Sequence, residues 1–176
     1  PRLGELTRRQ LEDVVRGGAE AITAVHDLGV DHARVERQRI AVDDGWDVPW
    51  DGPGRPERGA SQLGTLGGGN HFIELQRCEQ TQSLFVMLHS GSRGFGHGLA
   101  TNFMAMARDE RPEVPADLGY FAPGSASHAS YRNAVAAGAN YAIANRLLLF
   151  SAVAEAFEAV FGRPLRLVYE ISHNLV

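Results

Sequence analysis

The fold predicted for this chain depends on the alanine-rich stretch Tyr131-Arg-Asn-Ala-Val-Ala-Ala-Gly-Ala-Asn-Tyr-Ala-Ile-Ala-Asn-Arg146. It lies within a run that predicts one long helix over 130–161, which Gly162 and the following Arg-Pro end. Apolar residues recur on one face at helical spacing, namely Ala134, Ala137, Tyr141, Ala144 and Leu148. We interpret the stretch as a core helix with polar edges, not as a cofactor-binding motif.

The segments around this helix predict a mixture of helices and short strands. We expect further helices over 7–28 and 98–108, and strands over 71–75, 83–88 and 165–171. Thr7 and Gln10 form a candidate capping box at the start of the first helix. The segment 43–60 is rich in Asp, Gly and Pro and is read as a loop or an insertion. The pattern predicts one domain of the α/β class.

Composition excludes several kinds of protein. The chain has 176 residues and a net charge of 17 − 21 = −4, so it does not hold nucleic acid by bulk positive charge. Hydrophobic residues make up 44%, which argues against intrinsic disorder. No apolar run approaches the roughly 20 residues that cross a bilayer. The single cysteine, Cys78, excludes an internal disulfide and fits a reducing compartment, so we expect a cytoplasmic protein.

Histidines occur where a predicted strand or a glycine-rich loop ends. They are His71, which follows Asn70, then His89, and His173, which precedes Asn174. Histidine is the commonest metal ligand, and strand ends are rigid places for a preorganised site. These residues are 18 and 84 positions apart along the chain, so only the fold can bring them together. The sequence leaves two interpretations open, a shared metal site and separate histidines with structural roles.

Two glycine clusters flank these histidines. Gly64-Thr-Leu-Gly-Gly-Gly69 lacks the Lys-Ser/Thr of a phosphate-binding P-loop, and a strand, not a helix, is predicted after it. Ser90-Gly-Ser-Arg93-Gly-Phe-Gly could form a nest of backbone N–H groups for an anion, with Arg93 as a further donor. A tight turn with a surface arginine is the alternative. Glu74 is equally open, as a ligand, as an acceptor for a ribose or base, or as a solvated strand residue.

Taken together, these motifs resemble the RtcB family of RNA-splicing ligases. The resemblance is carried by Leu63-Gly-Thr-Leu-Gly-Gly-Gly-Asn-His-Phe-Ile-Glu74, Met87-Leu-His-Ser-Gly-Ser-Arg-Gly-Phe-Gly-His97, Ile171-Ser-His-Asn174 and the helix quoted above. It extends from about Leu6 onward and includes the order and spacing of the histidine segments. It implies an RtcB-like fold, in which a metal-bearing mixed sheet is flanked by helices.

The resemblance also implies a reaction. Members of this family use GTP and two Mn²⁺ ions to join an RNA 3′-phosphate or 2′,3′-cyclic phosphate end to a 5′-hydroxyl end. The reaction passes through a histidine–GMP intermediate and serves tRNA splicing and RNA repair. The implied partners are therefore GTP, Mn²⁺ and RNA with these ends. Whether an activating protein takes part is left open.

The family's site residues can be carried over position by position. The implied metal ligands are His71, His89 and His173. The implied guanylate contacts are Asn70, His71, Phe72, Ile73, Glu74, His173 and Asn174. Arg93 matches an arginine placed for a phosphate of the RNA or the nucleotide.

Three departures limit what the resemblance implies. The family's upstream Asp-x-x-Cys metal motif and its downstream motif with the guanylylated histidine have no match, so the nucleophile is expected to lie outside this chain. Glu170 stands where the family often has Asp. We therefore expect 1–176 to be the central part of a longer ligase domain, incomplete at both ends and inactive alone. A metal-dependent phosphohydrolase and a non-catalytic metal- or RNA-binding module remain the alternatives.

Overall fold

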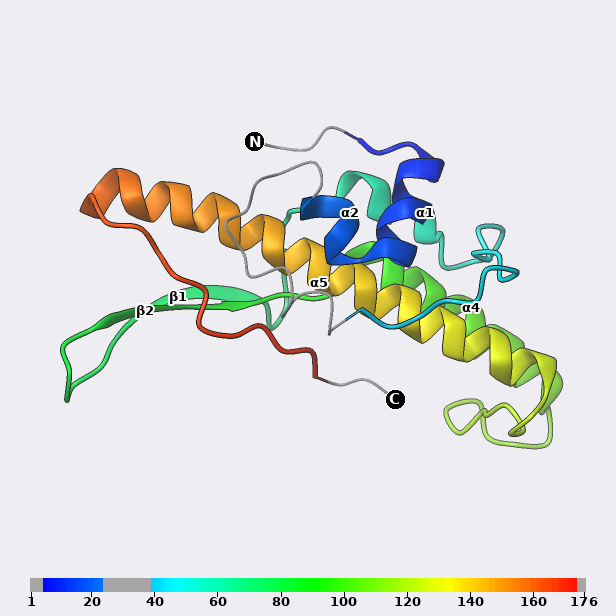
Figure 1. Cartoon of the computed structure of the whole chain (residues 1–176). Coiled ribbons are helices and arrows are strands. Elements are labelled where there is room, and N and C mark those ends of the chain that lie inside the picture. The colour runs from blue at the N-terminus through cyan, green and yellow to red at the C-terminus, as the bar shows by residue number, and fades with distance from the viewer. Residues whose placement is uncertain (1–4, 24–38, 174–176) are drawn as a thin grey trace.

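The computed structural model describes residues 5–23 and 39–173. Its elements, in chain order, are α1 (Arg8–Gly17), α2 (Ala19–Thr23), the 3-10 helix η1 (Pro56–Ser61), β1 (Phe72–Arg77), β2 (Leu84–His89), α4 (Arg93–Glu110) and α5 (Ala126–Phe161) (Figure 1). The predicted combination of helices and strands is confirmed. Although α5 has 36 residues, neither it nor any other described helix is apolar enough over a sufficient length to cross a membrane.

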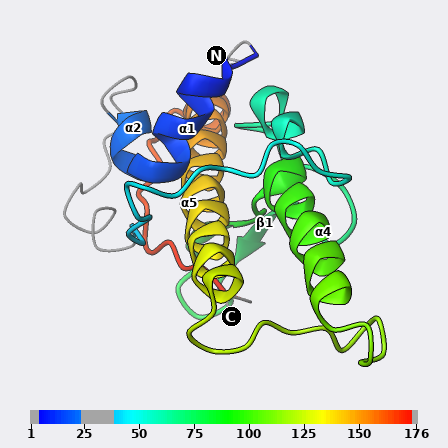
Figure 2. The ribbon, with the colours of Figure 1, turned by 90° about the vertical axis from the view of Figure 1, so that its right-hand side faces the viewer.

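The long helix α5 runs through the molecule, and the other helices pack along it (Figures 1 and 2). All five residues of its predicted apolar face are buried. The helix begins earlier than expected because the side chain of Ser125 caps it, accepting a hydrogen bond from the backbone N–H of His128 at 3.1 Å. It ends at Gly162, which adopts the left-handed conformation, φ 65°.

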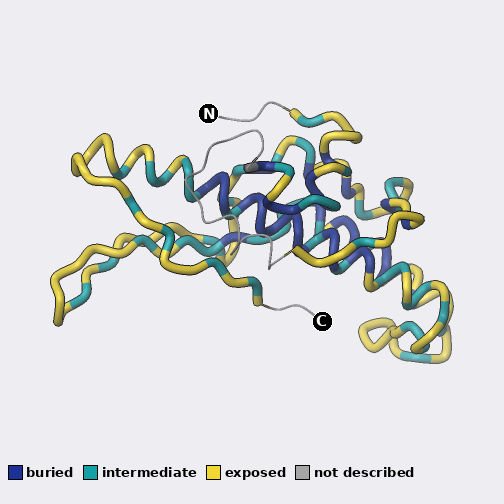
Figure 3. The backbone as a smooth tube through the Cα atoms, in the orientation of Figure 1, coloured by how far each residue is buried: buried dark blue, intermediate teal, exposed yellow. Residues whose placement is uncertain are grey.

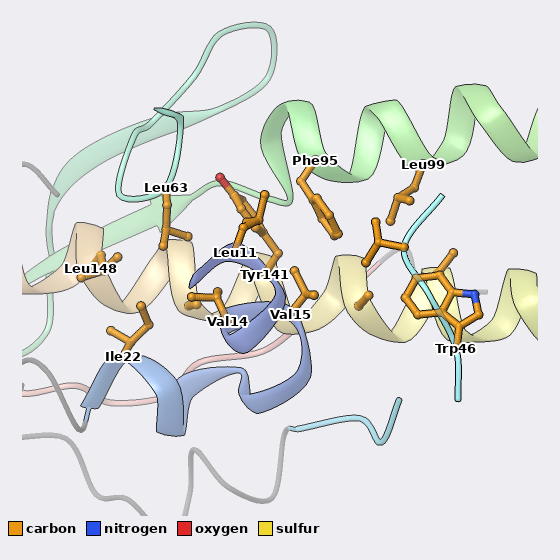
Figure 4. Packing of buried hydrophobic residues seen from close by; sticks show 14 of the residues in the cluster. Leu11, Val14, Val15, Ile22, Trp46, Leu63, Phe95, Leu99, Tyr141 and Leu148 are labelled. Atoms are coloured by element: carbon orange, nitrogen blue, oxygen red, sulfur yellow. The ribbon is translucent and has the colours of Figure 1, made fainter. Parts of the chain in front are cut away.

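The hydrophobic core lies between α5, α1, α4 and η1 (Figure 4). Phe95 of α4 stacks on Tyr141 of α5, with ring centroids 5.4 Å apart and planes 18° apart. Gly59 of η1 allows this close packing, since a Cβ there would lie 2.6 Å from the Cβ of Phe95. Small residues on α5 and η1 thus let three helices approach one another closely.

The N-terminal helical region differs from its prediction in one respect. The capping box is present, since the Thr7 hydroxyl accepts from the Gln10 backbone and the Gln10 side chain accepts from the Thr7 backbone. One helix over 7–28 is wrong, because Gly18 adopts φ 56° and separates α1 from α2. The rest of that predicted helix, beyond residue 23, lies outside the described residues.

The segment 43–60 is irregular up to η1, but it also contributes to the core. Trp46 and Val48 are buried there. The indole of Trp46 donates to the Ser130 hydroxyl at 2.9 Å, and the backbone N–H of Asp43 donates to Asn133 Oδ1 at 2.7 Å. Both partners belong to α5, so side-chain hydrogen bonds attach this segment to the long helix.

The two predicted strands pair with each other as an antiparallel hairpin, in a register that joins Phe72 to His89 and Arg77 to Leu84. Most of the hairpin is exposed or only half-buried (Figure 3). Its base, where β2 ends and α4 begins, is the part that adjoins the core. The hairpin therefore places His89 beside the helices.

Two further predictions are corrected. The helix expected over 98–108 begins at Arg93, so most of the glycine-rich segment belongs to α4. The run 165–171 is not assigned as a strand. It lies along α5, where Leu167 packs against Ile143 and Leu147. Within this described run only Leu167 makes this contact, while Val168, Tyr169 and Ile171 are exposed.

The buried hydroxyl of Tyr141 makes folding sensitive to alkaline pH. It donates to the carbonyl oxygen of Gly59 at 2.8 Å. Burial raises the pKa of Tyr141, and the charge of Arg93 offsets part of the rise. Because the folded state holds this proton more tightly than the unfolded state, the contribution to stability is complete below pH about 10 and is lost as the pH rises further.

We predict that Tyr141→Phe lowers the free energy of unfolding by about 0.5–1.5 kcal/mol at neutral pH, since one buried hydrogen bond is lost while the Gly59 carbonyl still accepts from the backbone N–H of Gln62 at 3.1 Å. Above pH about 10 the variant should lose stability less steeply than the wild type. Urea denaturation across this pH range measures both effects. Tyr169→Phe, at a residue that is 65% exposed, is the control. Parallel alkaline profiles for wild type and Tyr141→Phe would contradict the prediction.

Candidate functional site

The fold brings the three predicted histidines together. The ring centroids of His71 and His89 are 5.9 Å apart, and those of His89 and His173 are 5.1 Å apart. His71 directly precedes β1, His89 ends β2, and His173 lies in the segment that returns along α5. Residues that are distant in sequence thus meet at the base of the hairpin.

These histidines line one end of a cavity of about 350 Å³. This end is polar and also contains Asn70, Ser90, Arg146 and Ser172. The other end lies between α4 and α5 and is apolar, with Leu99, Phe103, Tyr131, Ala134, Val135 and Ala139 in its wall. A cavity of this size is at the lower end of the range for small-molecule sites.

The ring of His71 is held in one orientation. Its Nδ1 lies 2.9 Å from the carbonyl oxygen of Leu66. A carbonyl only accepts hydrogen bonds, so Nδ1 carries a proton, and in the neutral imidazole it is Nε2 that has the free lone pair. Gly91 leaves space beside that nitrogen, since a Cβ at Gly91 would lie 3.7 Å from His71 Nε2. This tautomer is the one that presents Nε2 to a metal ion.

The predicted guanylate contacts fall into three groups. Asn70, His71 and His173 line the cavity. Phe72 stacks on His89, with ring centroids 5.4 Å apart. Side chains alternate along a strand, so Glu74 shares the sheet face of Phe72, whereas Ile73 lies on the opposite face.

Two of the predicted contacts are Glu74 and Asn174. Glu74 is exposed, accepts a hydrogen bond from Gln76 Nε2 at 3.2 Å, and is not part of the cavity wall. Asn174 lies outside the described residues. The structure thus brings Asn70 and the three histidines into one wall, and it leaves Phe72, Ile73 and Glu74 out of that wall.

Arg93 lies against the first glycine cluster. It begins α4 with φ 51°, and its Nε donates to the Thr65 hydroxyl at 3.2 Å. A Cβ at Gly67 would lie 1.9 Å from Arg93 Nη1, so a larger residue there would displace the guanidinium group. Within the predicted anion nest, the N–H of Gly94 already donates to Gln62 Oε1 at 2.7 Å.

The imidazole nitrogens of the three histidines are suitable ligands for a divalent cation. Imidazole nitrogens bind Mn²⁺, Zn²⁺ and related ions, and His71 presents Nε2 in the required protonation state. Within residues 5–23 and 39–173, no three His, Cys, Asp or Glu side chains are already placed to hold a metal ion. The rings are neighbours, and binding one ion would require them to turn toward it.

Sequence reasoning missed the polar residues of α5 that adjoin this site. Asn145 and Arg146 were interpreted as part of a core helix, yet both bond to the segments that carry the histidines. The sequence did contain a signal that Asn145 would be buried, because Asn145 follows Ala144 and lies close to the apolar face of the helix. A buried amide at such a position must find hydrogen-bond partners.

Comparison with known proteins gives one consistent result. The sequence profile of the family described as "tRNA-splicing ligase RtcB" matches residues 2–176. The chain is 34% identical over 187 residues to "RNA-splicing ligase RtcB" of Mycobacterium tuberculosis, covering 96% of this chain and 43% of that protein. It is 38% identical over 141 residues to "tRNA-splicing ligase RtcB" of Aeropyrum pernix, covering 67% and 29% respectively. The chain thus spans less than half the length of these relatives.

We predict that two adjacent glycines respond differently to substitution. Gly67 has φ 93°, so Gly67→Ala should lower the free energy of unfolding by about 1–2 kcal/mol from backbone strain and should displace the Arg93 guanidinium group. Gly68→Ala is the matched control, since a Cβ there meets nothing within 4 Å. Its effect should stay within about 0.5 kcal/mol. Urea denaturation of both variants tests this, and equal losses would contradict it.

Proposed function

The chain belongs to the RtcB family, and on that premise we propose that it forms part of a GTP- and Mn²⁺-dependent RNA ligase. The enzyme joins RNA 3′-phosphate or 2′,3′-cyclic phosphate ends to 5′-hydroxyl ends through a histidine–GMP intermediate, in tRNA splicing or RNA repair in the cytoplasm. The main support is the meeting of His71, His89 and His173 at one polar cavity end.

In this proposal the three histidines hold the metal. Bound Mn²⁺ supplies positive charge that neutralises phosphate oxygens and aligns a displacement at phosphorus. His71 contributes Nε2, because its Nδ1–H is donated to the Leu66 carbonyl. His89 is held by the hairpin register and by its stacking on Phe72. The histidine that receives the guanylate is assigned to a part of the protein outside this chain.

Arg93 and Asn70 are assigned to phosphate and nucleotide contacts. The Nε of Arg93 is engaged by Thr65, and its two Nη groups have no hydrogen-bond partner among the described residues. A guanidinium with open Nη donors suits the planar, bidentate binding of a phosphate. Asn70 is exposed and lines the cavity beside His71, so its amide is available to a ligand.

A metal-dependent phosphohydrolase is the second candidate function. Three imidazoles at a cavity that Arg146 also lines would serve the hydrolysis of a phosphate ester as well as its transfer. The two functions differ in their product, which is a joined RNA in one case and free phosphate in the other. A non-catalytic module would bind metal or RNA and form neither product.

We predict that the full-length protein joins an RNA bearing a 2′,3′-cyclic phosphate to an RNA bearing a 5′-hydroxyl only when GTP and Mn²⁺ are both present. Gel analysis of labelled RNA measures the product. A joined strand without GTP, or phosphate release without joining, would contradict the ligase proposal. Phosphate release without joining would favour the phosphohydrolase.

We also predict that His89→Ala weakens the binding of Mn²⁺ by at least about tenfold, since it removes the imidazole that adjoins both other rings. Isothermal titration of the full-length protein measures the affinity. His97→Ala is the control, because His97 lies on the exposed face of α4, near the Thr101 hydroxyl and outside the cavity wall. Equal affinities for wild type and His89→Ala would count against the metal site.

A further inference from the structure

We propose that Asn145 and Arg146, two adjacent residues of α5, are positioning residues that hold the histidine-bearing segments in one arrangement. Neither residue contacts a histidine ring in any hydrogen bond of the described chain; both act through the backbone and side chains beside the rings. The positioning role does not depend on the proposed function. Only the expected effect on Mn²⁺ binding rests on it, because that effect assumes a metal site at this end of the cavity.

Asn145 connects two loops inside the protein. Its side chain is completely buried. Oδ1 accepts from the backbone N–H groups of Gly64 at 2.7 Å and Thr65 at 3.1 Å. Nδ2 lies within hydrogen-bond distance of the Thr65 carbonyl at 3.2 Å, the Ser90 hydroxyl at 3.0 Å and the Gly91 carbonyl at 3.1 Å. One amide thus joins the glycine-rich loop to the segment that follows β2.

These contacts lead directly to two of the rings. The Ser90 hydroxyl, which accepts from Asn145, donates to the Leu66 carbonyl at 2.9 Å. The same carbonyl accepts from Nδ1 of His71 at 2.9 Å. Ser90 also directly follows His89 in the chain. Asn145 therefore fixes the carbonyl that selects the tautomer of His71, together with the residue next to His89.

Arg146 extends the arrangement to the third histidine. Its Nη1 donates to the Ser90 carbonyl at 3.3 Å, and its Nη2 donates to the Ser172 hydroxyl at 2.7 Å. It also forms an ion pair with Glu170, in which the two side chains are only 11% and 9% exposed. Ser172 directly precedes His173, so Arg146 holds the end of β2 and the segment 170–173 against α5.

Another buried asparagine of the same helix provides a matched comparison. Asn140 is also completely buried and makes hydrogen bonds of similar length, at 2.8–2.9 Å, to backbone groups of Val15 and Ile40. Its partners lie in α1 and in the segment before residue 43, and it does not line the cavity. Asn140→Ala therefore removes equivalent buried hydrogen bonds without disturbing the histidine segments.

The test is a histidine side-chain NMR experiment on the full-length protein, ¹⁵N-labelled at histidine and free of metal. In the wild type we expect His71 to show a single tautomer, protonated at Nδ1. Asn145→Ala should shift the His71 and His89 signals and mix the His71 tautomers, whereas Asn140→Ala should leave both unchanged. Ser90→Ala, a milder change that removes only the connecting hydroxyl, should alter His71 in the same way.

The contribution of Arg146 is tested by a double variant. Arg146→Leu combined with Glu170→Leu removes both charges and leaves no unpaired charge buried. It should shift the His173 signals while His71 keeps its tautomer. In a Mn²⁺ titration, Asn145→Ala should bind about 10- to 100-fold more weakly than the wild type, and Asn140→Ala should bind as the wild type does.

Unchanged histidine signals in both Asn145→Ala and Ser90→Ala would overturn the proposal. Equal changes in Asn145→Ala and Asn140→Ala would also overturn it, because they would mean that any loss of packing along α5 disturbs the rings. The spectra are recorded without metal. A wild-type protein that binds no Mn²⁺ would therefore contradict the proposed function, while the histidine spectra would still decide the positioning role.

Discussion

The fold depends on one constraint, which is that the middle of α5 is buried while it carries polar side chains. A buried amide or guanidinium group without hydrogen bonds is costly, so each of these side chains must reach a partner. Asn133 bonds to Asp43, Asn140 to the N-terminal part of the core, and Asn145 to the glycine-rich loop. The long helix therefore determines where the loops that cross it can lie, and hence where the histidines meet.

Alanine and glycine make this arrangement possible because they bring backbones close together. Where the neighbouring helices approach α5, as at Gly59, a larger residue would collide with a side chain of the core. The same principle operates at the site, where Gly67 admits the guanidinium group of Arg93 and Gly91 leaves space beside His71 Nε2. In the core, small residues permit tight packing, and beside Arg93 and His71 they leave room for the side chain.

The parts of the fold set by local sequence were predictable. The apolar face of α5, the capping box at Thr7 and the hairpin each follow from spacing or from neighbouring residues. The break at Gly18 was missed because a helical apolar pattern continues across it, although the pair Gly17-Gly18 is a local signal for a helix end. The roles of Asn145 and Arg146 were also hidden, since most of their partners are backbone groups distant in sequence. Periodicity identifies buried faces, but it does not reveal which carbonyl a buried amide will meet.

Burying the ion pair between Arg146 and Glu170 costs free energy. Removing two charges from water is expensive, and an apolar pair of similar size often stabilises a protein as well or better. Stability alone therefore does not account for a nearly buried pair at the wall of a cavity. The pair places an arginine where it can bond to Ser90 and Ser172 together, which a leucine could not do. Ser90 directly follows His89, and Ser172 directly precedes His173. The arginine therefore holds both histidine-bearing segments against α5, which offsets the cost of burying the charges.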